Sequence, residues 1–111
     1  MTANRRRGEI SAELDGKEHR LCLTLGALAE LEAAYAADDL GALVERFSHG
    51  RLSALDMIRV IGAGLRGAGN DISDEAVRAM RSADGAAGFA AVVSDLLTTT
   101  FGAAGAEAPN P

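Results

Sequence analysis

Residues 62–67 have the spacing in this chain that most resembles nucleotide chemistry. Gly62, Gly64 and Gly67 form a G-x-G-x-x-G pattern, which in dinucleotide-binding folds joins a strand to a helix and lets the backbone approach a pyrophosphate. Here a helix-capping pattern at Ser53 precedes it, and no second strand–helix–strand unit fits in the residues that follow. We therefore favour a helix surface of small residues that packs closely against a neighbour and then unwinds. A nucleotide-binding enzyme is the remote alternative.

Histidine and cysteine could supply metal ligands or a nucleophile, but their spacing argues against both roles. His19 and Cys22 lie three residues apart on a predicted strand, so their side chains point to opposite faces. His49 directly follows Ser48, and sequence neighbours rarely pair as base and nucleophile. The single cysteine also excludes an internal disulfide. We predict no metal site, no cofactor and no catalytic residue, and hence a protein that is not an enzyme.

Asp71, Ser73 and Glu75 have the alternate spacing of a calcium-binding loop. In such a loop, Ala76 and Ser82 would stand where Gly and Glu are required. Ser73 followed by acidic residues is better explained as the N-cap of a helix.

The charge pattern excludes several classes of partner. The net charge is −5, and it would be more negative without Arg5–Arg7, which we predict to lie in a flexible basic leader of residues 1–7. An acidic body repels phosphates, so nucleic acid is not expected as a partner. No apolar segment follows the arginines to make a secretory signal, and the longest stretch without ionisable residues, Leu96 to Ala106, is too short to span a membrane. We predict a cytoplasmic protein.

The elements that position these residues begin with a predicted hairpin. Apolar and polar residues alternate on both sides of Asp15-Gly16, from residue 8 to residue 25, and Asp-Gly between such runs is typical of a two-residue turn. That turn pairs Ile10 with Leu21, so both apolar rows share one face.

About five short helices should follow, because apolar residues then recur at helical spacing. We predict an α+β fold in which these helices pack on the apolar face of the two-stranded antiparallel hairpin. The single domain covers residues 8–101, and residues 102–111 form a disordered tail. The expected apolar stripes are Leu25, Leu28, Leu31 and Tyr35; Leu40, Leu43, Val44 and Phe47; Leu55, Ile58, Ile61 and Leu65; Val77 and Met80; and Phe89, Val92, Val93, Leu96, Leu97 and Phe101.

Two surfaces could bind a partner protein. The first strand, Glu9 to Leu14, has one free edge that can accept another strand. The last helix has an apolar stripe wide enough for Leu96, Leu97 and Phe101 to contact a partner helix as well as the core. For both surfaces, we favour burial within the domain over contact with a partner.

One long run of residues is more specific than any motif above: Leu23-Thr24-Leu25-Gly26-Ala27-Leu28-Ala29-Glu30-Leu31-Glu32. Further segments of the same pattern are residues 43–47, Gly50-Arg51-Leu52-Ser53 through Gly62-Ala63-Gly64-Leu65-Arg66, and Ile72-Ser73-Asp74-Glu75. Together with the early strand and turn, they resemble a family of small proteins encoded in gene transfer agents and related tailed phages. The resemblance covers about residues 8–101.

The resemblance implies a role in tail morphogenesis. The family is described both as a tail tube protein and as a tail assembly chaperone, and the implied partners are the tape measure protein, the tail tube protein or both. A homo-oligomer and incorporation into the phage-like particle stay open. A tube subunit ordinarily needs a larger β-sheet than two strands, so we favour the chaperone, with the structural tail subunit as the alternative. The resemblance carries over no functional residues.

Overall fold

The computed structural model describes residues 3–49 and 51–102, and its sheet is a single antiparallel hairpin. Strand β1 (Glu9–Leu14) pairs with β2 (Lys17–Cys22) with Ile10 opposite Leu21. The turn residues Asp15 and Gly16 have φ angles of 57° and 75°, as a two-residue turn of this type requires. The predicted register is confirmed.

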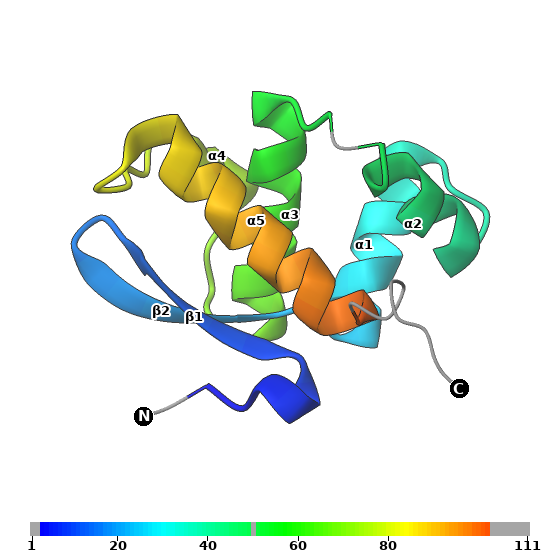
Figure 1. Cartoon of the computed structure of the whole chain (residues 1–111), viewed down its shortest axis with the longest axis horizontal. Helices are drawn as coiled ribbons and strands as arrows, with labels where there is room; N and C mark the ends of the chain where they lie inside the picture. Colours follow the sequence, from blue (N-terminus) through cyan, green and yellow to red (C-terminus); the bar gives the residue numbers. More distant parts are fainter. Residues whose placement is uncertain (1–2, 50, 103–111) are drawn as a thin grey trace.

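Within residues 3–49 and 51–102, five α-helices follow the hairpin and lie to one side of it (Figure 1). The α+β fold predicted from the sequence is therefore confirmed. Their bounds are α1 Leu25–Tyr35, α2 Leu40–Phe47, α3 Ala54–Gly67, α4 Asp74–Arg78 and α5 Gly85–Phe101.

Side-chain caps begin four of these helices. Thr24, Asp39, Ser53 and Ser73 each accept a hydrogen bond from a backbone N–H of the first turn, which satisfies a donor that has no partner within the helix. At Ser53 the bond is reciprocal, because the Asp56 carboxylate accepts from the Ser53 N–H at 2.9 Å. The capping patterns predicted at Ser53 and Ser73 thus placed the starts of α3 and α4 correctly.

The core lies between the hairpin and helices α3 and α5. Helix α3 packs on β2, α5 crosses β1, and α1 packs on the other side of α3 (Figure 1). Helix α2 contacts mainly α1 and lies at the periphery. The large side chains with less than 2% exposure are Ile10, Leu14, Leu21, Leu31, Leu43, Val60, Ile61, Leu65, Val93 and Leu96.

Some residues of the predicted stripes lie at the surface instead. Leu25 is 79% exposed, because α1 packs through Ala27, Leu28 and Leu31 and leaves its first residue outside that contact. Leu40, Val44 and Leu55 are also exposed, at 38–40%. A periodic stripe defines an apolar face, but the neighbouring elements decide how much of that face they cover.

The predicted leader, residues 1–7, is described from residue 3 onward. Arg5–Arg7 form a short 3₁₀ turn, and the Arg5 guanidinium bonds to the Asp95 carboxylate and, at 2.9 Å, to the Thr99 hydroxyl. The segment therefore has a defined place against α5, which its charge alone did not indicate. The predicted disordered tail, apart from Gly102, lies outside the described residues.

Candidate functional site

The G-x-G-x-x-G segment lies entirely within helix α3, so that helix, and not a strand, directly precedes Gly62. A Cβ at Gly62 would lie 2.1 Å from the Asp74 carboxylate oxygen, and one at Gly67 would lie 2.0 Å from the backbone oxygen of Cys22. Protein atoms therefore fill the space that a nucleotide phosphate would need beside the backbone. The prediction of a closely packed helix surface is confirmed.

Arg66, within the same segment, ties three parts of the chain together. Its guanidinium pairs with the carboxylates of Glu30 at 2.7 Å and Asp74 at 3.0 Å, and it donates to the backbone oxygen of Ile72 at 2.9 Å. Hydrogen bonds from Arg66 to Glu30, more than any other contact, raise the pKa of Arg66. This arginine joins α1, α3 and the start of α4, and its donors are directed at protein groups.

At the opposite end of α3, Asp56 is a buried carboxylate with 4% exposure. It accepts hydrogen bonds from the Tyr35 hydroxyl at 2.5 Å, the Arg46 guanidinium at 3.2 Å and the Ser53 N–H at 2.9 Å. Arg46 and Arg59 also lie against the Tyr35 ring, at 4.8 and 5.0 Å from its centre. This cluster fastens α2 to the rest of the fold.

The electrostatics of the Asp56 cluster are those of a structural ion pair. Burial opposes ionisation of Asp56, but hydrogen bonds from Tyr35 and Ser53 and the charge of Arg46 outweigh it and hold the pKa of Asp56 below its ordinary value. Burial, together with the bond to Asp56, raises the pKa of Tyr35. Both shifts favour the pairing seen here, a neutral phenol donating to a carboxylate.

The other residues considered for chemistry have structural partners. The Cys22 thiol points at the backbone oxygen of Arg7, 3.7 Å away, and burial raises its pKa. His49 follows the C-cap of α2, and its Nε2 lies 3.6 Å from the Glu45 carboxylate. Ser73 caps α4 as predicted. The His19 side chain contacts its own strand, β2, because its Nδ1 lies 3.1 Å from the backbone oxygen of Lys17. Among residues 3–49 and 51–102, no three potential ligands gather around a metal position.

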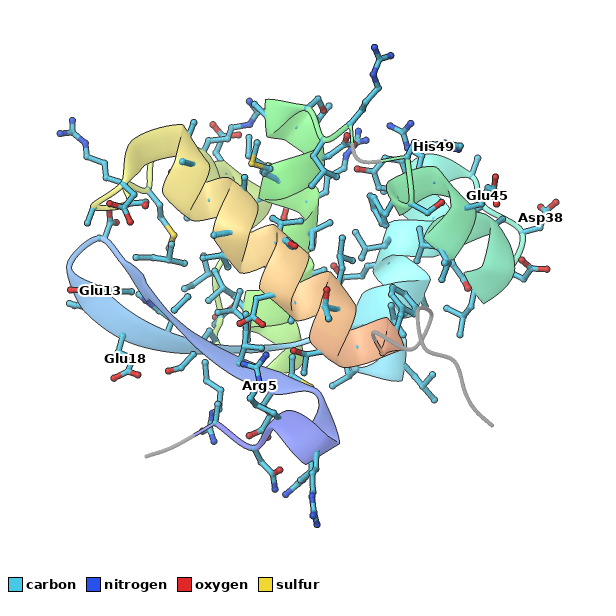
Figure 2. All side chains as sticks on the ribbon, in the orientation of Figure 1. Arg5, Glu13, Glu18, Asp38, Glu45 and His49 are labelled. Atoms are coloured by element: carbon cyan, nitrogen blue, oxygen red, sulfur yellow. The ribbon has the colours of Figure 1, made fainter. Side chains whose placement is uncertain are left out.

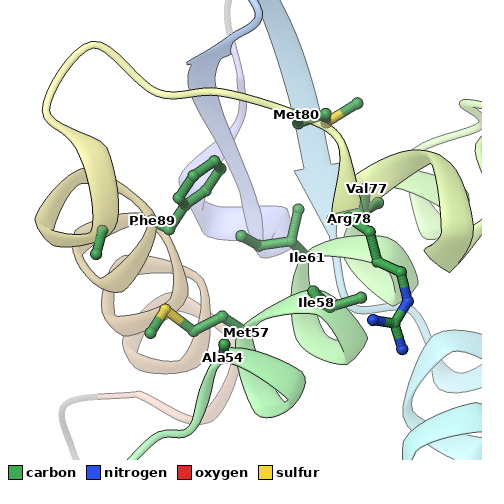
Figure 3. Close-up of a pocket in the computed structure, with 9 residues that line it drawn as sticks. Ala54, Met57, Ile58, Ile61, Val77, Arg78, Met80 and Phe89 are labelled. Carbon is green, nitrogen blue, oxygen red and sulfur yellow. The ribbon is translucent and has the colours of Figure 1, made fainter.

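An apolar pocket of about 180 Å³ lies between α3, α4 and α5 (Figure 3). Buried Ile61 and Val77 form part of its lining, together with half-buried methionine, isoleucine and phenylalanine side chains. Arg78 is the one charged residue among the described residues that line it. The full lining is Ala54, Met57, Ile58, Ile61, Val77, Arg78, Met80, Ala86 and Phe89.

The chemistry of this pocket is binding of apolar groups. A cavity of about 150 Å³ accepts a benzene molecule, so the pocket has room for one leucine or phenylalanine side chain. Methionine side chains such as Met57 and Met80 adapt to ligands of different shape. The stripes predicted from the sequence included Ile58, Ile61, Met80 and Phe89, but the spacing of three helices created the cavity, and no sequence signal reported it.

The residues predicted for partner contact divide between core and surface. Leu96 has 0% exposure and packs against Gly64, so it belongs to the core and cannot contact a partner in this conformation. Leu97 and Phe101 are half-buried and pack against the core from its edge. The accessible part of the apolar stripe on α5 is therefore smaller than the sequence pattern indicated.

Comparison with known families gives a match over residues 7–103 to the family described as phage tail tube protein, GTA-gp10. The chain belongs to this family. The resemblance found in the sequence is thereby confirmed, and the protein is related to the tail tube proteins of phages and gene transfer agents. No curated protein and no solved structure matches it. Within the described part of the chain, no helix is long and apolar enough to cross a membrane.

Proposed function

We propose that this protein is a tail assembly chaperone that binds an apolar helix of the tape measure protein. The observation that carries the proposal is the apolar pocket between α3, α4 and α5, which opens at the surface and has room for one large apolar side chain. Its floor is fixed by the core, while Met57 and Met80 can adjust to successive side chains of a partner helix.

The same features favour binding over catalysis. Among the described residues, the lining contains no carboxylate, histidine, serine or cysteine that could act as acid, base or nucleophile. The acidic surface of the chain, with a net charge of −5, would help to keep a complex with an aggregation-prone partner in solution. We therefore propose a non-enzymatic role.

The test is co-expression of the full chain with the tape measure protein of the same gene cluster, followed by affinity capture. Ala86→Phe should fill the pocket from its exposed rim and reduce capture by about tenfold, as expected when one apolar anchor is blocked. Ala87→Phe makes the same change at an exposed neighbour that does not line the pocket, and it should bind like the wild type. Equal capture by both variants would contradict the proposal.

A structural tail tube subunit is the second candidate, and the description of the family favours it. The described residues form a sheet of only two strands, which is small for the wall of a tube. Mass spectrometry of purified particles separates the two roles. We expect the protein to be scarce or absent in finished particles, whereas many copies per tail would establish the tube subunit and overturn the chaperone.

A further inference from the structure

The outer edge of strand β1 has backbone groups available for another strand. Leu14 and Lys17 flank the two-residue turn and hydrogen-bond to each other in this register. Because such pairs alternate along an antiparallel ladder, the N–H and C=O groups of Ser11 and Glu13 point away from β2. No described residue hydrogen-bonds to these four groups.

Both ends of this edge are already held in place. The Glu9 N–H donates to the backbone oxygen of Asn4 at 3.1 Å, and the Asp15 N–H donates to the backbone oxygen of Arg81 at 2.8 Å. The intervening backbone is therefore kept extended before any partner arrives. A preorganised edge loses little conformational entropy on binding.

Two of the side chains beside this edge, Glu13 and Glu18, are acidic. Glu13 lies directly opposite Glu18, and both are exposed on the outer side of the hairpin (Figure 2). The Ser11 hydroxyl donates to the Glu18 carboxylate at 2.5 Å, but within the described chain neither glutamate has an ion pair. Like charges directly opposite each other destabilise a hairpin, and a cation placed next to Glu13 would relieve this repulsion.

We propose that the β1 edge binds an extended basic segment of a partner protein as a third strand, with a lysine or arginine beside Glu13. Backbone hydrogen bonds to Ser11 and Glu13 would supply part of the affinity, and charge would supply the specificity. A second copy of this chain fits less well, because pairing of two β1 edges would set Glu13 of one copy opposite or diagonal to carboxylates of the other. The proposal holds for a chaperone and for a tube subunit alike, since it does not involve the apolar pocket.

The first experiment is an NMR titration of the full chain with the peptide acetyl-Thr-Lys-Val-Lys-Val-Thr-amide. We expect the amide signals of Ser11 and Glu13 to shift and their hydrogen exchange to slow, with no such change for the peptide in which Glu replaces Lys. Absence of these shifts at millimolar peptide, or equal binding of the acidic peptide, would overturn the proposal.

Two charge-reversal variants test the specificity. Glu13→Lys should weaken binding of the basic peptide by about three- to tenfold, because it turns a cross-strand attraction into a repulsion. Asp38→Lys makes the same change in net charge at the far end of the molecule (Figure 2) and should leave binding unchanged at physiological salt. Equal weakening by both variants would show only general attraction to an acidic protein and would contradict a site at the edge.

A backbone variant tests strand addition itself. Ser11→Pro removes an N–H that points away from β2, so the β1–β2 ladder can remain intact, which circular dichroism would check. It should weaken peptide binding by about tenfold. If the variant is unfolded, a peptide N-methylated at alternate residues provides the same test on the wild-type chain. Unchanged affinity in either form, or a dimer that Ser11→Pro abolishes in the absence of peptide, would overturn the proposal.

Discussion

The two halves of helix α3 are held in different ways. In the C-terminal half, Gly62, Gly64 and Gly67 let the helix backbone approach α4, α5 and β2 so closely that a methyl group would collide with each of them. In the N-terminal half, larger side chains such as Met57 leave an open pocket, and the buried Asp56 carboxylate fastens the helix to Tyr35 and Arg46.

The difference shows how one helix can serve both the fold and a binding surface. Close packing of small residues fixes position and leaves no space for a ligand. Polar anchoring on one side permits a cavity on the other, because the helix does not depend on apolar contacts at every point. Substitutions in the two halves should therefore have different effects, and we expect the following results, from the largest to the smallest.

Gly67→Ala should have the largest effect. Its Cβ would lie 2.0 Å from the backbone oxygen of Cys22, and backbone cannot move aside as a side chain can. We expect a loss of about 3 kcal/mol or more in the free energy of unfolding, measured by urea denaturation. The control is Gly26→Ala in α1, where the nearest neighbour of the new Cβ would be the Thr24 hydroxyl at 3.9 Å. This substitution should stabilise the protein by up to about 1 kcal/mol. Similar losses for both would refute the close-packing argument.

Asp56→Asn should lower the free energy of unfolding by about 2 kcal/mol at neutral pH, because it removes the charge from a buried carboxylate that accepts three hydrogen bonds. The pKa of Asp56 is lower in the folded protein than its ordinary value. The stabilisation is thus fully present above the unfolded pKa and is lost as pH falls through the folded pKa. Unfolding curves of wild type and variant should therefore converge in acid, while exposed Asp71→Asn should follow the wild type throughout.

Gly64→Ala should have an intermediate effect, smaller than that of Gly67→Ala. The nearest atom to its Cβ is the end of the Leu96 side chain at 2.7 Å, and that end can rotate away at the cost of core packing. We expect a loss of about 1 to 2 kcal/mol in the same denaturation experiment. A loss as large as that of Gly67→Ala would mean that flexible and rigid neighbours make no difference here.

Ala86→Leu, on the rim of the pocket, should have the smallest effect. The added side chain can enter the 180 Å³ cavity, so we expect a change in stability within about 1 kcal/mol, on the stabilising side. Ala87→Leu, which is exposed and does not line the pocket, should be neutral in thermal unfolding. Strong destabilisation by Ala86→Leu alone would show that the pocket cannot accept a side chain.

Several features could be predicted from the sequence because their causes are local. Asp15-Gly16 fixed the turn and the register of the hairpin, and Ser53 with Asp56 fixed the start of α3. The small residues from Gly62 to Gly67 indicated close packing, but their spacing did not identify Asp74, Leu96 and Cys22 as the neighbours. Their partners come from distant parts of the chain, which spacing within one segment does not encode.

The candidate site was predicted less well. Leu96 was expected to contact a partner as well as the core, yet it has 0% exposure and packs against Gly64 of α3. The pocket lined by Met57, Met80 and Phe89 was not predicted at all, because a cavity depends on the distance between elements and not on the polarity of any one of them.

What the sequence determined by itself is the order and type of the main elements and the starts of α3 and α4, through turn chemistry, capping and apolar periodicity. It also determined an acidic net charge and membership of a tail protein family. The tertiary structure alone decided which apolar residues are covered, where a cavity remains, and how far each strand edge stays open. The physical reason is that burial depends on how two elements pack together. The sequence of one element shows only which of its faces is apolar.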